Sequence, residues 1–272
     1  MPSASAFEFL TPPPRSAKPR TRGLTVTSDK AKSLADAQSL VEAVGDIVDH
    51  MKIPDHVGVM WRNSAEQIRA KNALYAKAGI DTLPGGIPFE VAAVQGKVPQ
   101  FMERVAALGF HGVEVSEDSI EISPADRIAA IKLGISAGLT VFTELGKKFP
   151  DKPLDAVEAV AMAQRDLDAG AFLVVVEKSD VALVMKNRSD TIHRLMAGVG
   201  AERLIVECGP GADRFDIAKW LIGEFGAEVN LENIDAEDAY IIEAMRYGLN
   251  RAIDYSYFHA WHGKRLPPVK AK

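Results

Sequence analysis

Four glutamates recur at the ends of short apolar runs, and the distance between them along the chain is nearly constant. The runs read VEV, TVFTE, FLVVVE and LIVE, and their glutamates are Glu114, Glu144, Glu177 and Glu207, separated by 30, 33 and 30 residues. A carboxylate at the end of a buried strand costs free energy unless another group pairs with it. Four carboxylates in one register therefore predict strands that end at a shared charged site.

The rest of the chain shows the same alternation of short apolar runs with segments of helical period. Helix starts are predicted at Ser64, which forms a capping box with Gln67, and at Ser123, Asp155, Ser189 and Asp235. Strands are predicted at residues 23–28, 46–53, 80–85, 112–116, 139–144, 171–177, 203–207 and 227–231.

Eight strand–helix units in about 230 residues predict a single closed (β/α)8 TIM barrel. The barrel is expected over residues 22–250, with a surface extension at 1–21 and a carboxyl-terminal tail at 251–272. An open doubly wound sheet is the alternative, but it normally carries a glycine-rich turn after the first strand. The turn here reads TSDKAKS and lacks glycine, which favours the barrel.

The composition of the chain limits the kinds of molecule that it is expected to bind. The chain has 47% hydrophobic and 25% charged residues, no apolar run long enough to span a bilayer, and no secretory signal at its start. Cys208 is the only cysteine, so no intrachain disulfide forms and a cytoplasmic location is expected. A net charge of −5 gives no overall attraction for nucleic acid or an anionic membrane. Small molecules or proteins are the expected partners.

Lysines and a glycine turn share the predicted strand ends with the glutamates. Lys52 lies near the end of the second strand, Gly85 and Gly86 follow the third, and Lys147 and Lys148 follow Glu144. Carboxylates suit a hard divalent cation such as Mg²⁺, and lysines neutralise phosphate or carboxylate groups of a substrate. One glutamate alone is as readily a structural ion pair, but four with lysines beside them favour a functional site.

The sequence resembles the phosphosulfolactate synthase family from about residue 7 to 250. The resemblance is carried by GDIVDHMK at 45–52, PGGIPFE at 84–90, LGFHGVEVSEDSIEIS at 108–123, VNLENI at 229–234 and, most specifically, TELGKKFPDK at 143–152. These (β/α)8 enzymes add sulfite to phosphoenolpyruvate in a Mg²⁺-dependent step, giving (2R)-phospho-3-sulfolactate. The resemblance thus implies a cytoplasmic lyase, and a homo-oligomer is expected.

The resemblance also implies roles for individual residues. Lys147 is the expected proton donor, with Lys52 and Glu144 as further catalytic groups. The expected metal ligands are Glu114, Glu144, Glu177 and Glu207. The expected substrate-binding residues are Lys148, Gly85, Gly86, Arg22, Asn230 and Arg251.

Several anion-binding turns depart from the family pattern. After Lys52 the chain reads IPDHVGVMW where the family has FGWGTS, and Ile87 stands where the family has threonine. An arginine is missing after Glu177, and another is displaced to Arg251. These changes leave two alternatives open: a related barrel lyase that adds another nucleophile to phosphoenolpyruvate, and a non-catalytic binding or stress-related protein. Retention of Lys147 and the four glutamates argues against the second, because unpaired buried charge is costly.

Overall fold

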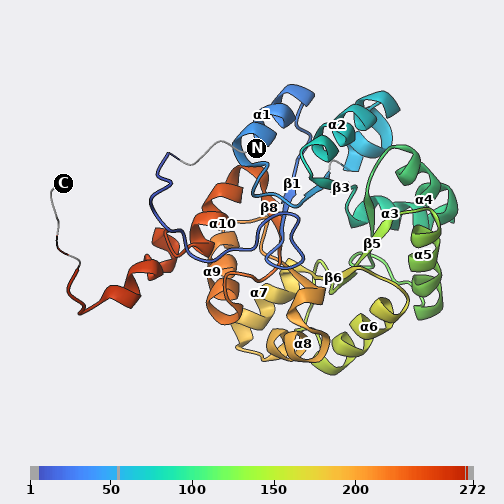
Figure 1. Cartoon of the computed structure of the whole chain (residues 1–272). Coiled ribbons are helices and arrows are strands. Elements are labelled where there is room, and N and C mark those ends of the chain that lie inside the picture. Colours follow the sequence, from blue (N-terminus) through green and yellow to red (C-terminus); the bar gives the residue numbers. More distant parts are fainter. Residues whose placement is uncertain (1–5, 54–55, 267, 269–272) are drawn as a thin grey trace.

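The computed structural model describes residues 6–53, 56–266 and 268, and its centre is an eight-stranded parallel barrel (Figure 1). The strands are β1 (Thr25–Ser28), β2 (His50–Lys52), β3 (Asp81–Leu83), β4 (Gly112–Val115), β5 (Thr140–Leu145), β6 (Leu173–Val176), β7 (Leu204–Glu207) and β8 (Leu231–Asp235). Their order is β3-β2-β1-β8-β7-β6-β5-β4, and every ladder is parallel. Between β3 and β4 the His111 amide donates to the Thr82 carbonyl at 3.0 Å. The predicted (β/α)8 barrel is confirmed.

Helices surround the barrel and run back from the end of each strand to the start of the next. They are α1 (Leu34–Val44), α2 (Ala65–Lys77), α3 (Gly86–Val94), α4 (Val98–Ala107), α5 (Pro124–Ser136), α6 (Ala156–Asp168), α7 (Lys178–Asn187), α8 (Thr191–Val199), α9 (Arg214–Phe225) and α10 (Ala239–Arg246). The predicted capping box of Ser64 and Gln67 is present, and the side chains of Ser123 and Asp155 cap α5 and α6. None of the helices in the described part of the chain is long and apolar enough to cross a bilayer.

Side chains of alternate residues point into the barrel, because successive residues of a strand face opposite sides. Phe142, Val175 and Ile205 belong to an apolar cluster within the sheet. Two residues further along the same strands, or just beyond them, stand Glu144, Glu177 and Glu207. The same alternation that fills the barrel with apolar groups therefore lifts the glutamates to its carboxyl-terminal mouth.

Two predicted strands were placed wrongly. The second begins at His50 rather than at residue 46, because residues 45–47 form a turn. The eighth was predicted at 227–231 but occupies Leu231–Asp235. Val229, before it, is buried without being paired in the ladder. Asn230 instead accepts a hydrogen bond from the Leu24 amide and donates one to the Leu204 carbonyl, both at 2.9 Å.

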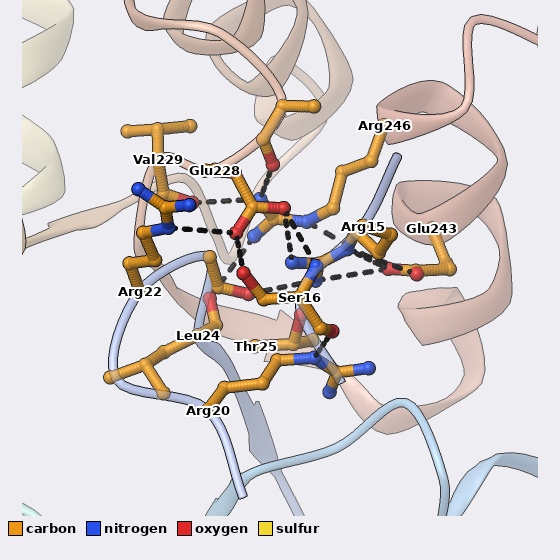
Figure 2. A network of polar contacts seen from close by, with 12 residues as sticks. Arg15, Ser16, Arg20, Arg22, Leu24, Thr25, Glu228, Val229, Glu243 and Arg246 are labelled. Carbon is orange, nitrogen blue, oxygen red and sulfur yellow. Dashed lines mark hydrogen bonds and ion pairs between the residues drawn. The ribbon is translucent and has the colours of Figure 1, made fainter. Parts of the chain in front are cut away.

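The amino-terminal segment joins a network of polar contacts at the opposite end of the barrel (Figure 2). The Arg15 side chain is only 4% exposed, and its guanidinium lies 3.2 Å from Glu228 and 3.1 Å from Glu243. Ser16 also donates to Glu228, and the buried Arg246 donates to the carbonyls of Leu24 and Val229. The predicted surface extension thus includes a buried ionic network, although its first five residues lie outside the described chain.

Beyond α10 the chain leaves the barrel. It forms two short 3-10 turns, η4 (Arg251–Ile253) and η5 (Ser256–Trp261), and the segment from residue 255 onward projects from the side of the molecule (Figure 1). We call residues 255–266 the arm. Residues 267 and 269–272 of the predicted tail lie outside the described residues.

Candidate active site

Lys52 lies at the centre of the carboxyl-terminal mouth, surrounded by glutamates from other strands. Its ammonium nitrogen is 2.9 Å from Glu114, 3.3 Å from Glu232 and 3.4 Å from Glu207. The Lys52 side chain is 5% exposed, and each glutamate side chain is at most 1% exposed. Because β2, β4, β7 and β8 each supply one of these residues, the ring of charge forms only when the barrel closes.

A second lysine lies beside this ring. The ammonium of Lys148 is 2.5 Å from Asp118 and 2.8 Å from Glu177. Carboxylate oxygens of Asp118, Glu144 and Glu177 all lie within 4.8 Å of one another, close enough to share a metal ion. The Glu144 Oε1 atom is buried and accepts no hydrogen bond from the described residues. The three carboxyl groups therefore fit a hard divalent cation, which prefers oxygen ligands.

The carboxylates of the mouth differ in their affinity for protons. Burial raises the pKa of Glu144 well above its ordinary value, and the charges of Glu114 and Glu207 raise it further. Burial likewise raises the pKa of Glu207, although Lys52 opposes the shift. For Glu232, burial raises the pKa to about 7. The carboxyl groups at this mouth outnumber the two ammonium groups beside them, so the carboxylates favour binding protons or a cation.

The two lysines stay charged. Burial alone would lower the pKa of Lys52, but Glu114, Glu232 and Glu207 outweigh it and hold the pKa well above its ordinary value. The pKa of Lys148 is raised in the same way against its own burial, chiefly by Glu144 and then Glu177. Both side chains are therefore ammonium ions at neutral pH.

A cavity of about 390 Å³ opens above the two lysines. Gly85, Gly86 and Ile87 line it on one side, where α3 begins, and Gly209 with Pro210 line another. Gly85 has a φ of 80°, which favours glycine, and a Cβ on Gly86 would lie 2.5 Å from the Cβ of Ser116. The glycine pair thus lets α3 start close against β4 as well as bordering the cavity.

Lys147 and Lys148 point in different directions. The Lys147 ammonium donates to the carbonyls of Glu117 at 2.5 Å and Ile120 at 2.8 Å, in the loop between β4 and α5. Lys148 lines the cavity, whereas Lys147 is absent from the described residues that line it. The structure therefore brings the second lysine of the pair, and not the first, to the acidic cluster.

Three of the predicted substrate-binding residues lie at the wrong end of the barrel. Arg22 precedes β1, is largely exposed and lies 3.8 Å from Glu228 (Figure 2). Asn230 precedes β8, and Arg251 follows α10 on the exposed surface. These three are absent from the described residues that line the cavity, because residues before a strand or after its helix lie at the amino-terminal end.

The mouth also contains residues that were not predicted. Asp118 reaches it from the loop after β4, and Glu232 from within β8. Asn233, at a positive φ of 54°, donates to Glu207. A signal for Glu232 was present, since it directly follows the strand predicted at 227–231. Asp118 lies in a loop, where residue periodicity gives no signal.

The fold and site define a class before any comparison. A parallel (β/α)8 barrel with buried carboxylates and two lysines at its carboxyl-terminal mouth is typical of (β/α)8 enzymes, whose active sites lie at this end.

Comparison with known proteins makes the assignment specific. The chain belongs to the (2R)-phospho-3-sulfolactate synthase (ComA) family, whose model matches residues 13–251. It is 31% identical over 254 residues to the phosphosulfolactate synthase of Methanothermobacter thermautotrophicus, covering 90% of this chain and 96% of the relative. It is 32% identical over 257 residues to the enzyme of that name from Methanocaldococcus jannaschii, with the same coverage. The chain is thus a phosphosulfolactate synthase, a lyase.

Solved structures support the fold alone. The 3-dehydroquinate dehydratase of Geobacillus kaustophilus aligns with a TM-score of 0.53 at 11% identity, covering 81% of this chain and 90% of that protein.

Proposed function

We propose that this chain adds sulfite to the methylene carbon of phosphoenolpyruvate and gives (2R)-phospho-3-sulfolactate. The observation that carries the proposal is the pair of lysines, the buried Lys52 and the half-buried Lys148, set among carboxylates at the mouth of a barrel of this family. Both substrates are anions, and the lysines supply the positive charge that they need. The enzyme is proposed to work in the cytoplasm, and its one cysteine, Cys208, is a free buried thiol.

Asp118, Glu144 and Glu177 are proposed to hold a divalent cation, taken to be Mg²⁺. Only two of the four expected metal ligands belong to this group, because Glu114 and Glu207 contact Lys52 instead. When bound, Mg²⁺ would supply positive charge beside the substrate carboxylate. Lys148 contacts two of the three proposed ligands, so the cation and the Lys148 ammonium would compete for the same oxygens.

Lys52 is proposed to stabilise the charge that develops during carbon–sulfur bond formation. The sulfur lone pair attacks the methylene carbon, and the carbon–carbon double-bond electrons move toward the carbon that bears the carboxylate. Negative charge then accumulates on that carboxylate. Three glutamates fix the Lys52 ammonium before the reaction begins, and such preorganised charge lowers the barrier more than charge that must reorient.

Lys148 is proposed to complete the addition as the general acid. Its proton would pass to the carbon that carries the phosphate, forming the new carbon–hydrogen bond and leaving a neutral amine. We assign this step to Lys148 rather than Lys147, because the Lys147 ammonium is bonded to two loop carbonyls. Lys147 would then act as a positioning residue that ties the β5–α6 connection to the loop carrying Asp118.

The amino-terminal end of α3 is proposed to receive the phosphate. Gly86 and Ile87 begin this helix at the edge of the cavity, and free backbone amides at a helix start favour anions. Ile87 offers no hydroxyl there. Together with the altered turn after Lys52 and the arginine missing after Glu177, this departure from the family pattern supports a second candidate function, the addition of a different nucleophile to phosphoenolpyruvate.

One experiment tests both candidates. The purified chain is incubated with phosphoenolpyruvate, Mg²⁺ and sulfite, the enol absorbance is followed, and the product is identified by mass. Loss of absorbance with a sulfite adduct is expected. An adduct formed only with another nucleophile, such as a thiol or sulfide, would select the second candidate. Binding of phosphoenolpyruvate without any adduct would contradict both and leave a binding protein.

A further inference from the structure

Phe149 is the most exposed of the large apolar residues in the described part of the chain, and it stands at the mouth of the active site. It is 95% exposed. It also lines the cavity that Lys52, Lys148 and Glu177 line. A single apolar residue on a surface needs no explanation, but a cavity lined by charged groups is an unusual place for an aromatic ring. We therefore looked for a role of this ring in the cavity.

Phe149 begins a short stretch that makes few contacts of its own. Residues 149–153 read FPDKP, and none of them forms a hydrogen bond or an ion pair with another described residue. Pro150 and Pro153 have no amide hydrogen to donate. Within the described chain, no polar contact therefore holds the stretch in its present position.

One buried carboxylate fixes the chain on both sides of this stretch. Asp180, in the first turn of α7, is 2% exposed. Its oxygens accept the amide of Lys147 at 2.9 Å and the amide of Leu154 at 3.1 Å. Gly146, at a φ of 110°, permits this approach, because a Cβ there would lie 2.5 Å from the Asp180 carboxylate. Residues 149–153 can therefore move while the chain on either side stays in place.

We propose that Phe149 closes over the substrate once it is bound and shields the reacting carbon atoms from water. Before substrate binds, the charged groups of the cavity are hydrated, and covering them with an aromatic ring costs free energy. A bound anion balances the charge of the lysines, and the methylene group of phosphoenolpyruvate gives the ring an apolar surface to cover. Substrate binding thus makes closure favourable.

Closure would serve the addition in two ways. Excluding water lowers the local dielectric constant, so the Lys52 ammonium acts more strongly on the charge that develops on the substrate carboxylate. It also keeps bulk water away from the carbon that is to be protonated, so the proton comes from Lys148, the residue directly before Phe149. The inference rests on the proposed function, because it takes phosphoenolpyruvate as the ligand.

Fluorescence quenching tests the closure directly. The variant is Phe149→Trp in a Trp61→Phe/Trp261→Phe background, and the one natural tryptophan that remains, Trp220, is half-buried. Phosphoenolpyruvate with Mg²⁺ should lower the quenching of the introduced indole by acrylamide and shift its emission to shorter wavelength. The control is Tyr240→Trp in the same background. Tyr240 is 67% exposed and absent from the described cavity lining, so its quenching should not change.

A second pair of variants measures what the ring contributes to binding. Phe149→Ala should weaken the apparent affinity for phosphoenolpyruvate about tenfold, the loss expected when one buried aromatic side chain is removed. Phe149→Trp should keep the affinity, because it keeps an aromatic ring. The affinity is taken from the rise in melting temperature as phosphoenolpyruvate is added, so the measurement needs no turnover.

The outcomes separate this inference from the reaction proposed above. Binding of phosphoenolpyruvate that leaves the quenching at position 149 unchanged, or full affinity in Phe149→Ala, would overturn the role of Phe149 and leave the proposed function standing. An introduced indole that is already protected before ligand is added would also overturn it, because another surface would then cover the ring. Failure of phosphoenolpyruvate to bind the unaltered chain would refute the proposed function, and the closure with it.

Discussion

Replacing Lys52 with methionine should destabilise the barrel strongly, and the loss should grow with pH. The substitution keeps most of the side-chain volume but removes the charge that lies within 3.4 Å of three buried carboxylates. Removing one partner of a buried ion pair costs about 3–5 kcal/mol. At about 2–4 °C per kcal/mol for a chain near this size, the melting temperature should fall by roughly 6–20 °C at pH 8.

The pH dependence follows from the raised carboxyl pKa values. Glu232 has a folded pKa of about 7, above its ordinary 4.5, so the folded protein binds more protons than the unfolded chain between those values. The free energy of unfolding therefore falls as pH rises through this window. Without Lys52, Glu207 and Glu232 would hold their protons to still higher pH. The variant should lose less stability at pH 5.5 than at pH 8.

The assay is urea unfolding followed by circular dichroism at both pH values, with EDTA present. Lys30→Met is the control, because the Lys30–Asp235 pair is half-exposed and should contribute no more than about 1 kcal/mol. Adding Glu232→Gln to Lys52→Met should recover part of the loss, since it removes one unpaired acid. A loss below about 1 kcal/mol at pH 8, or an equal loss at both pH values, would refute the electrostatic account.

Other substitutions test the remaining roles. Lys148→Met should lower kcat by about 10²–10⁴-fold, the usual contribution of a general acid, whereas Lys147→Met should retain more activity; the reverse order would exchange their roles. Asp118→Asn should lower the apparent affinity for Mg²⁺ by at least about tenfold, as measured from the rise in melting temperature during a Mg²⁺ titration. An unchanged titration would remove Asp118 from the ligand set. Burial lowers the pKa of His50, so the folded protein resists its protonation and loses stability as pH falls below 6.5. His50→Gln should reduce the loss of unfolding free energy at acid pH by about 1.4 kcal/mol for each unit by which the His50 pKa is lowered, measured by urea titrations. The same dependence of unfolding free energy on pH in both proteins would contradict the assignment.

The barrel could be predicted because its signals are local. Apolar runs, caps such as Ser64 and Asp155, and the repeated strand-end glutamates each depend on neighbours in the sequence. The eighth strand was misplaced because three of its five residues, Glu232, Asn233 and Asp235, are polar groups that belong to the acidic mouth. A strand that supplies polar groups to a site lacks the apolar pattern of a buried strand, so its sequence resembles that of a turn.

The membership of the site could be predicted only in part. Glu144 and Glu177 belong to the carboxylate cluster as expected from their strand ends, but Asp118 reaches it from a loop. The choice between Lys147 and Lys148 depends on side-chain direction in the loop after β5, where the two ammonium groups contact different partners. The direction of a side chain in a loop depends on how the loop packs, and the sequence pattern does not predict this packing.

The ionic network at the amino-terminal end of the barrel bears on the order in which the chain is made and folded. Arg15 contacts Glu228 and Glu243, which are 213 and 228 residues further along the sequence. During synthesis from the amino terminus, this arginine has to wait for nearly the whole chain before either partner exists. A segment made well before the barrel is then among the last to find its place, and until α10 emerges it is open to proteases and chaperones.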